Sequence, residues 1–272
     1  MKLLIDIGNS TIVIALADAE GNISNTWRIK TMKNETLSFF RHELRVGLMT
    51  FGLARNGSEP LPLKAVIISS VVPEINDKLS QAIYDTTGLT PHFFSVDDAQ
   101  KVIGINIESP SQLGKDRLAD AIGARCYYGV PAIVIDMGTA TTIGVINQDG
   151  EFVGGMIAPG VKTSLKALTE KASQLPAITI EKPRSIIGGN TVECMQSGIV
   201  YGTAAMIDGI IDRLLPDLYT TDTQAAATGE TTNDTKIIAT GGMAKQIVPF
   251  CHHNIIIDEY LQFKGLFRST DY

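Results

Sequence analysis

The sequence is poor in cysteine and has no apolar run long enough to cross a bilayer. Its three cysteines, Cys126, Cys194 and Cys251, are widely spaced and form no C-x-x-C pair. That pattern disfavours a structural zinc site and is typical of reduced thiols in a cytosol. A membrane-spanning helix needs about 20 apolar residues, and no apolar leader with a cleavage site precedes the first strand. We therefore expect a cytoplasmic protein without a membrane segment.

Positive charge is also scarce. The chain has 23 Lys and Arg against 29 Asp and Glu, a formal net charge of −6. Such a balance gives no long-range attraction to a polyanion, and no local basic patch compensates for it. We expect small-molecule partners and no nucleic acid.

Three patterns that bind ligands in other proteins are missing. There is no G-x-x-x-x-G-K-[ST] and no G-x-G-x-x-G, which excludes a P-loop and disfavours a Rossmann dinucleotide site. His252 and His253 are neighbours, but no third or fourth ligand lies at metal-binding spacing. We interpret this histidine pair as part of a solvated loop.

A short segment near the start of the chain is present twice. Residues 3–11 read LLIDIGNST, where an acid, a glycine and three polar residues interrupt an apolar run, and residues 133–146 read IVIDMGTATTIGVI. The matched pairs are Asp6 and Asp136, Gly8 and Gly138, and Thr11 and Thr141, each 130 residues apart, and the glycines of the next turn, Gly21 and Gly150, 129 apart. A shared offset through strand, turn and strand indicates an internal duplication.

The pattern of strands and helices predicts an α/β protein. Three short strands at 2–9, 11–18 and 25–31 open the first copy, and strands then alternate with helices, which favours a mixed sheet covered by helices. We expect two duplicated domains, residues 1–130 and 131–272, with a cleft between them. Further helices are predicted at 161–175 and 190–218, and the polar stretch 219–235 is predicted to be a mobile surface loop.

The two interrupted strands have the composition of phosphate-binding turns. Glycine lets the backbone approach a ligand, and amides and hydroxyls can donate hydrogen bonds to phosphate oxygens. The hydroxyls available are those of Ser10, Thr11, Thr139, Thr141 and Thr142. Asp6 and Asp136 would repel phosphate, so they require a cation or a metal-bound water in between, as magnesium or a monovalent ion would provide. ATGGMAK, residues 239–245, is a further candidate turn on the nucleotide side.

Each of these segments also has a purely structural interpretation. DIGNST can be a tight hairpin in which Asp6 and Asn9 cap their own backbone. DMGTATT can be a strand edge rich in threonine. LGKDR, residues 113–117, can be a solvated helix edge with an intrahelical ion pair.

Five segments together resemble the type III pantothenate kinase family: DIGNST, LGKDR, DMGTATT, GGMIAPG and ATGG. The first and third are typical of the wider superfamily of acetate and sugar kinases, Hsp70 and actin, whereas GKDR and GGMIAPG narrow the resemblance to pantothenate kinases. The resemblance runs from Leu3 to the last strands. It implies two ribonuclease H-like (actin-like ATPase) domains and transfer of the ATP γ-phosphoryl group to the primary hydroxyl of pantothenate, the first step of coenzyme A synthesis.

The resemblance also implies a role for each matching residue. Asp116 corresponds to the proton acceptor, which suits a carboxylate that orients an attacking hydroxyl. Asp136 corresponds to a ligand of potassium or ammonium, and Asp6 would hold magnesium through water. The residues implied in ATP binding are Asp6, Ile7, Gly8, Asn9, Ser10, Thr11, Ile12, Val13 and Thr139, and those implied in pantothenate binding are Gly114, Lys115, Asp116, Arg117 and Thr191. Asp120, one turn beyond Asp116, is interpreted as structural.

The family also implies a homodimer with the pantothenate pocket at the subunit interface. Helix 111–129 is a candidate for that interface, with Leu118, Ala121, Ile122 and Arg125 available for contact. One departure concerns the pattern I-x-Y-x-x-P, since this chain reads INIESP with Ile107 at the tyrosine position. A hydroxyl that could contact the substrate is therefore missing.

Two other functions would use a similar sequence. One is a non-catalytic accessory regulator of transcription, and the other is a different phosphotransferase or phosphohydrolase of the superfamily. Retention of Asp6, Asp116, Arg117 and Asp136 argues against a pure scaffold, which has no use for acids beside a phosphate site. The sequence therefore favours the kinase.

Overall fold

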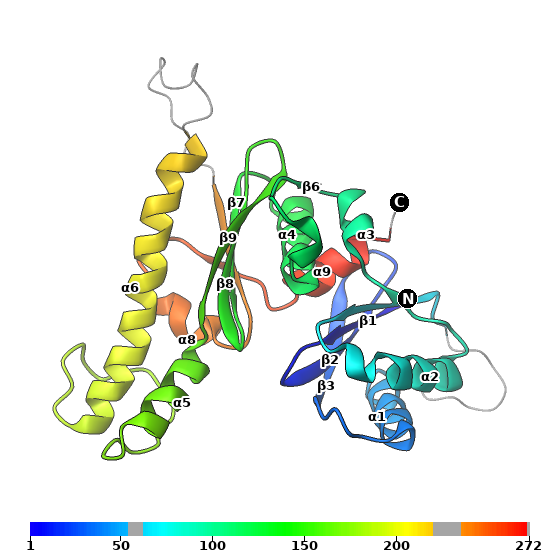
Figure 1. The fold of residues 1–272 in the computed structure, drawn as a ribbon, viewed down its shortest axis with the longest axis horizontal. Helices are drawn as coiled ribbons and strands as arrows, with labels where there is room; N and C mark the ends of the chain where they lie inside the picture. The colour runs from blue at the N-terminus through cyan, green and yellow to red at the C-terminus, as the bar shows by residue number, and fades with distance from the viewer. Residues whose placement is uncertain (54–61, 220–234, 271–272) are drawn as a thin grey trace. The chain divides into compact units, whose positions relative to one another are not determined.

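The computed structural model describes residues 1–53, 62–219 and 235–270 (Figure 1). The chain divides into two compact units. Unit 1 comprises Met1–Cys126 and Tyr260–Tyr272, and unit 2 comprises Tyr127–Glu259. The division into 1–130 and 131–272 expected from the repeat differs from this grouping mainly at the C-terminal segment, which packs with unit 1. The loop predicted at 219–235 falls on residues 220–234, which lie outside the described residues.

The sheet of unit 1 has five strands in the order β3-β2-β1-β4-β5. Strand β1 pairs antiparallel with β2 and parallel with β4, and β5 continues the parallel part. The bounds are β1 Lys2–Ile7, β2 Thr11–Ala17, β3 Ile23–Lys30, β4 Ala65–Ser70 and β5 His92–Phe93. This is the mixed sheet that the sequence predicts. A further short strand, β6, spans Gly104–Ile105 and is not part of this five-stranded sheet.

The strands of unit 2 repeat this topology in the order β9-β8-β7-β10-β11. Strand β7 pairs antiparallel with β8 and parallel with β10, as β1 does with β2 and β4. The bounds are β7 Ala132–Met137, β8 Ala140–Ile146, β9 Glu151–Pro159, β10 Lys236–Thr240 and β11 Ile256–Ile257. The internal duplication is thus present in the fold.

The strand register corrects one detail of the predicted repeat. The amide of Gly8 donates to the carbonyl of Thr11 across the first turn, whereas the corresponding bond in the second turn joins Gly138 to Ala140. The second turn is one residue shorter, so Thr11 corresponds to Ala140 and not, as predicted, to Thr141. Beyond the turn the offset is 129, the same as between Gly21 and Gly150. The register also shifts at equivalent places, between Leu16 and Ala17 in β2 and between Val145 and Ile146 in β8.

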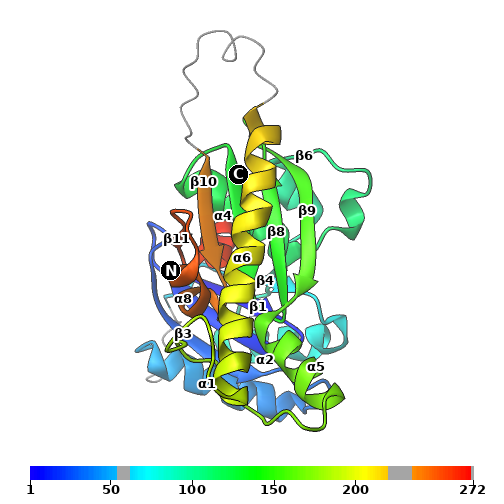
Figure 2. The same cartoon turned by 90° about the vertical axis from the view of Figure 1, so that its left-hand side faces the viewer.

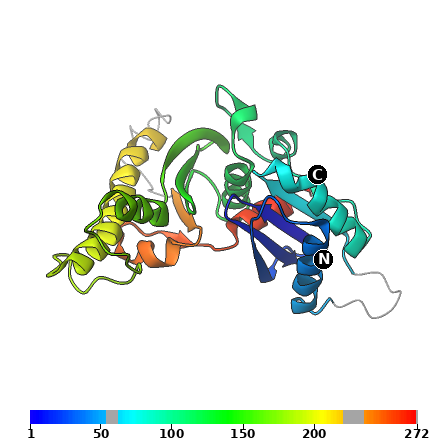
Figure 3. The same ribbon diagram turned by 60° about the horizontal axis from the view of Figure 1, so that its bottom comes forward.

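Helices cover both faces of the unit 1 sheet. Apolar residues at helical spacing, among them Phe40, Leu44 and Leu48, turn toward the strands and form one core with alternate residues of β1. Figures 1 and 3 show α1 beside the strands, and it packs against β3 and α2. The helices are α1 Leu37–Thr50, α2 Asn76–Thr87, α3 Val96–Gln100, α4 Lys115–Tyr127 and α9 Leu261–Arg268, with short 3₁₀ turns at Pro73–Ile75 and Pro110–Gln112.

Helix α9 belongs to unit 1 because it packs against β1, β4 and α4. A Cβ at Gly265 would overlap the carbonyl oxygen of Ala119, and a Cβ at Gly123 would overlap the carbonyl oxygen of Leu261. Two glycines facing the partner helix therefore allow the backbones of α4 and α9 to approach closely. This contact joins the end of the chain to its first half.

In unit 2, one long helix lies along the sheet. Helix α6, Thr191–Tyr219, packs buried residues such as Val200, Ile207 and Ile211 on β7 and β8 (Figure 2). The other helices are α5 Val161–Lys171, shorter than the predicted 161–175, and α8 Ala244–Ile247, which continues into a 3₁₀ turn at Val248–Phe250. Among the helices in the described part of the chain, none combines the length and apolar character needed to cross a bilayer.

A capping box at the start of α3 makes unit 1 sensitive to acid. Ser95 and Asp98 exchange hydrogen bonds, and His92 Nε2 lies 2.8 Å from Asp98 Oδ2. Burial raises the pKa of Asp98, but hydrogen bonds from Ser95, His92 and Lys101 outweigh it and lower the pKa to about 2. Because the folded pKa is below the unfolded value, the stabilisation is present above about pH 4 and is lost as the pH falls toward 2.

We expect Asp98→Asn to lower the free energy of unfolding by about 2 kcal/mol at neutral pH. Urea unfolding followed by circular dichroism measures the difference, which should shrink steadily as the pH is lowered through the carboxylate range. Asp97→Asn, an exposed aspartate in the same helical turn, is the matched control. A difference between Asp98→Asn and wild type that does not change with pH would contradict this assignment.

Candidate active site

The first polar turn is held in shape by a residue that the sequence did not single out. Thr31 donates from its hydroxyl to the carbonyl of Gly8 at 2.7 Å and from its amide to the carbonyl of Ser10 at 3.1 Å. The amide of Gly8 bonds to the carbonyl of Thr11 at 3.1 Å. These three bonds fix the turn between β1 and β2, and the side chains of Asn9 and Ser10 stay exposed.

The residues predicted to bind ATP in this turn differ in what they can offer. The side chains of Ile7 and Ile12 are fully buried in the core of unit 1, and that of Val13 is buried as well. Only the backbone of these three residues can contact a ligand. The polar residues at the tip of the turn are the ones whose side chains are accessible.

Asp6 lies at the end of β1 and is held there from the far end of the chain. Gln262 Nε2 in α9 donates to Asp6 Oδ1 at 2.8 Å. On the neighbouring strand β4, Ser69 stands opposite Asp6, and its fully buried hydroxyl has no hydrogen-bond partner among the described residues. A half-buried carboxylate next to an unsatisfied hydroxyl is a set of hard oxygen donors, which suits magnesium bound directly or through water.

The second turn repeats the arrangement of the first. Thr163 Oγ1 donates to the carbonyl of Thr139 at 2.7 Å, and the amide of Gly160 donates to the same carbonyl at 3.1 Å. A Cβ at Gly160 would overlap the carbonyl oxygens of Thr139 and Gly138, so only glycine fits there. Thr139 lies at the exposed tip of this turn.

A glycine turn after β10 packs directly against Asp136. Thr240 stands opposite Asp136 on the parallel strand, and the amide of Met243 donates to the carbonyl of Met137 at 3.2 Å. Gly241 has a φ of +85°, and a Cβ there would overlap Asp136 Oδ1. The structure thus brings the predicted ATGG turn to the carboxylate predicted to bind a monovalent cation.

One predicted phosphate donor of this turn is not accessible. Thr141 is 1% exposed, and its hydroxyl has no hydrogen-bond partner among the residues that are described. The shorter turn explains this, because Thr141 takes the position of the buried Ile12 in the first copy. Thr142 is half-buried, opposite Asp136 on β8.

The GKDR segment forms the first turn of α4 and is not a solvated helix edge. Asp116 Oδ1 accepts a hydrogen bond from the amide of Arg117 at 2.8 Å, and a Cβ at Gly114 would overlap that same oxygen. Burial lowers the pKa of the Arg117 guanidinium, and the nearby Asp116 carboxylate raises it. A partly desolvated cation attracts an anion more strongly than an exposed one does, because water screens it less, and the Asp116 carboxylate offsets part of its charge.

Three of the four predicted dimer contacts on α4 are wrong. Leu118, Ala121 and Ile122 are at most 1% exposed, so they contribute to the interior of the protein and cannot meet a second subunit. Arg125 is exposed and donates to the carbonyl of Val102 at 2.6 Å. Asp120 is buried, as its structural interpretation requires. Ile107, at the position of the missing tyrosine, is half-buried in the loop before α4.

Thr191 begins α6 at the edge of a cavity. Asn190 caps the helix by accepting from the amide of Glu193 at 3.0 Å, and Glu193 Oε2 in turn accepts from the amide of Gly189 at 2.9 Å. The cavity, of about 790 Å³, lies between α5 and the start of α6. Its wall is mainly apolar, from residues such as Leu165, Leu168 and Met195, and carries the polar groups of Ser164, Asn190 and Thr191. This composition is typical of a small-molecule site.

Five strands of each unit share one topology, and in each unit one strand, β1 or β7, carries an acid near its end and leads into a small polar turn. This arrangement defines a duplicated ribonuclease H-like fold of the actin-like ATPase class. Among solved structures, the chain is similar to an activator of 2-hydroxyisocaproyl-CoA dehydratase from Clostridium difficile with bound ADPNP, with a TM-score of 0.54, 12% identity and coverage of 98% of this chain and 94% of the other. It is similar to the same degree, at a TM-score of 0.54, to a protein from Campylobacter jejuni described as a Baf family transcriptional activator, with 19% identity over 98% and 96% of the two chains. At these identities the likeness shows the fold alone.

Sequence similarity identifies the family within this class. The sequence model of type III pantothenate kinase matches residues 2–213. A type III pantothenate kinase of Halalkalibacterium halodurans is 35% identical over 266 residues, which are 98% of this chain and 97% of the relative. The chain belongs to the type III pantothenate kinase family.

Proposed function

We propose that this protein transfers the γ-phosphoryl group of ATP to the primary hydroxyl of pantothenate. One observation carries the proposal. This chain belongs to the family, and its GKDR segment begins α4 with a half-buried Asp116 beside a partly desolvated Arg117. Phosphoryl transfer depends mainly on positioning and charge stabilisation, with one carboxylate to accept the proton of the attacking hydroxyl. This pair of residues supplies both requirements.

Each group then has a defined task. Asp116 orients the substrate hydroxyl and accepts its proton, while Gly114 leaves room for the carboxylate. Lys115 and Arg117 interact with the carboxylate of pantothenate. The two polar turns donate hydrogen bonds to the phosphates of ATP from Asn9, Ser10, Thr11 and Thr139. The strand pairing of Asp6, Ile7, Ile12 and Val13 and the amide of Gly8 hold the first turn in the shape that this binding needs.

Two cations complete the proposal. Magnesium neutralises the triphosphate when bound, and Asp6 holds it through water, a role supported by the hard oxygen donors at the end of β1 and β4. Asp136 binds potassium or ammonium, a role supported by the tight packing of Gly241 against its carboxylate, which fixes the oxygen in place. Without a cation in between, each of these carboxylates would repel the phosphates of ATP.

We also propose that pantothenate contacts Thr191 and that a second subunit covers this region. Unit 2 exposes several apolar side chains, of which Leu168 lines the cavity and Ile186, Ile187 and Val192 lie close in sequence to residues that line it. The exposed side chains are Val153, Met156, Ile157, Leu168, Ile186, Ile187 and Val192. A homodimer that covers these side chains accounts for their exposure in a single chain. We place this dimer in the cytoplasm, where ATP and potassium are abundant.

The test is a direct assay of the purified full-length protein. Incubation with ATP, magnesium, potassium and pantothenate should yield phosphopantothenate, detected by mass spectrometry, with one ADP per product. Omission of pantothenate should abolish ADP formation, and replacement of potassium by sodium should lower the rate. Formation of ADP without pantothenate would instead indicate a phosphohydrolase, and absence of both products would favour a regulator.

A further inference from the structure

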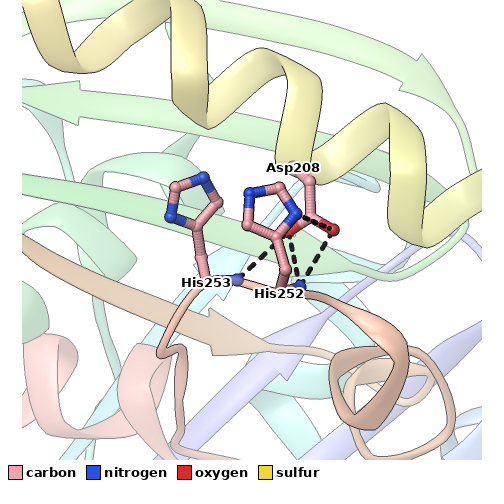
Figure 4. A group of neighbouring side chains, drawn as sticks. All are labelled: Asp208, His252 and His253. Atoms are coloured by element: carbon pink, nitrogen blue, oxygen red, sulfur yellow. Dashed lines mark hydrogen bonds and ion pairs between the residues drawn. The ribbon is translucent and has the colours of Figure 1, made fainter.

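A cluster outside the proposed active site joins α6 to the loop before β11. Asp208 of α6 is buried, and its carboxylate accepts hydrogen bonds from the amides of His252 at 3.0 and 3.1 Å and of His253 at 3.4 Å. The same carboxylate lies 3.0 Å from His252 Nδ1. Figure 4 shows the two imidazole rings side by side below the helix, with Asp208 next to His252. The loop is thus anchored to the helix at one point.

A second carboxylate of the same helix face completes the cluster. Asp212 is one turn beyond Asp208, so both side chains point to the loop. Asp212 Oδ1 lies 2.8 Å from His253 Nε2 and 3.8 Å from His252 Nε2. The rings of His252 and His253 are 4.3 Å apart between centroids. Two imidazoles and two carboxylates therefore converge on one small volume.

We propose that Asp208, His252 and His253, with Asp212 at the rim, form a binding site for a divalent transition-metal ion of the zinc type. One ligand atom from each of Asp208, His252 and His253 lies within 4.8 Å of the other two. Four donors around a zinc ion stand about 3.3 Å from one another. A small movement of the exposed His252 ring brings its nitrogen closer to that spacing. The site is independent of the proposed function, because none of its residues belongs to the polar turns or to the GKDR segment.

The donor set determines which ion fits. Neutral imidazole nitrogen combined with carboxylate oxygen is typical of Zn²⁺, Ni²⁺, Co²⁺ and Cu²⁺, whereas Mg²⁺ and Ca²⁺ prefer oxygen donors alone. Asp208 lies 3.0 Å from His252 Nδ1, so this nitrogen is the one that faces an ion held by Asp208. The two carboxylates also balance the charge of a divalent ion. A metal bound here would fasten the loop to α6 and stabilise unit 2.

The test is zinc binding by the full-length protein after removal of metals with a chelator. We expect one Zn²⁺ per chain by elemental analysis after dialysis, an increase in melting temperature with added Zn²⁺, and no such increase with Mg²⁺. Binding measured against a chromophoric zinc chelator should weaken by at least about tenfold in His252→Gln and in His253→Gln.

The control variant is His42→Gln, since His42 is an exposed histidine of unit 1 outside the cluster. It should bind zinc as wild type does. Asp208→Asn should also weaken zinc binding, but it removes an anchor of the loop and can unfold the protein for that reason alone. The two glutamine variants keep both carboxylates, so they decide whether the cluster binds zinc if Asp208→Asn fails to fold. Zinc binding that is unchanged in both glutamine variants, or no stoichiometric binding at all, would show that the cluster is only a hydrogen-bonded clamp between loop and helix.

Discussion

Replacement of Asp116 by asparagine is expected to lower kcat by a factor of about 10² to 10⁴, the usual contribution of a general base. Asparagine keeps the size of the side chain and can still accept the hydrogen bond from the Arg117 amide, which is 2.8 Å from Asp116 Oδ1 in wild type. It cannot accept the proton of the pantothenate hydroxyl. The loss should therefore appear in kcat, with little change in ATP affinity.

The measurement is a coupled assay of ADP release combined with calorimetric titration of ATP. Asp77→Asn is the matched control, because Asp77 is an exposed aspartate in the first turn of α2. Its kcat should equal that of wild type. Near-normal turnover of Asp116→Asn would remove Asp116 from the role of proton acceptor, whereas loss of ATP binding would assign it a role in nucleotide binding instead.

Replacement of Gly265 by alanine is expected to destabilise unit 1 by about 1 to 3 kcal/mol, the usual cost of overpacking. The added methyl group would overlap the carbonyl oxygen of Ala119, so α9 would have to move away from α4. That movement would also disturb Gln262, which holds Asp6 at 2.8 Å. We therefore expect a lower stability together with weaker binding of magnesium and ATP.

Chemical unfolding of the variant and titration with ATP in the presence of magnesium test both effects. Gly202→Ala serves as the control, since Gly202 lies inside α6 and a Cβ there would meet nothing within 4 Å. This change should stabilise the protein by about 0.5 to 1 kcal/mol, because alanine favours a helix over glycine. Equal stability of Gly265→Ala and wild type would show that α4 and α9 separate at no cost.

Local patterns were sufficient for much of the fold. The alternation of apolar and polar residues and the turn glycines predicted the three-stranded meanders, and the repeat of Asp6 and Asp136 predicted the duplication that the two sheets confirm. The family also followed from short segments, because GKDR and the two acidic turns are contiguous in the sequence. These features depend on neighbours within a few residues, which is why a sequence can reveal them.

The predictions that failed concerned packing. Periodicity on helix 111–129 shows an apolar face but not what covers it, so Leu118 and Ile122 were predicted at a subunit interface and are buried inside the protein. The equivalence of Thr11 and Thr141 failed for a related reason, because only the hydrogen bonds across each turn reveal that the second one is shorter.

The sequence by itself determined the repeated strand units, the two acidic turns and the family. Only the tertiary structure decided which distant residues support them. Gln262 is 256 residues from Asp6, and Asp208 is 44 residues from His252. Contacts over such separations are fixed by how helices pack on a completed sheet. A linear pattern contains no measure of that packing.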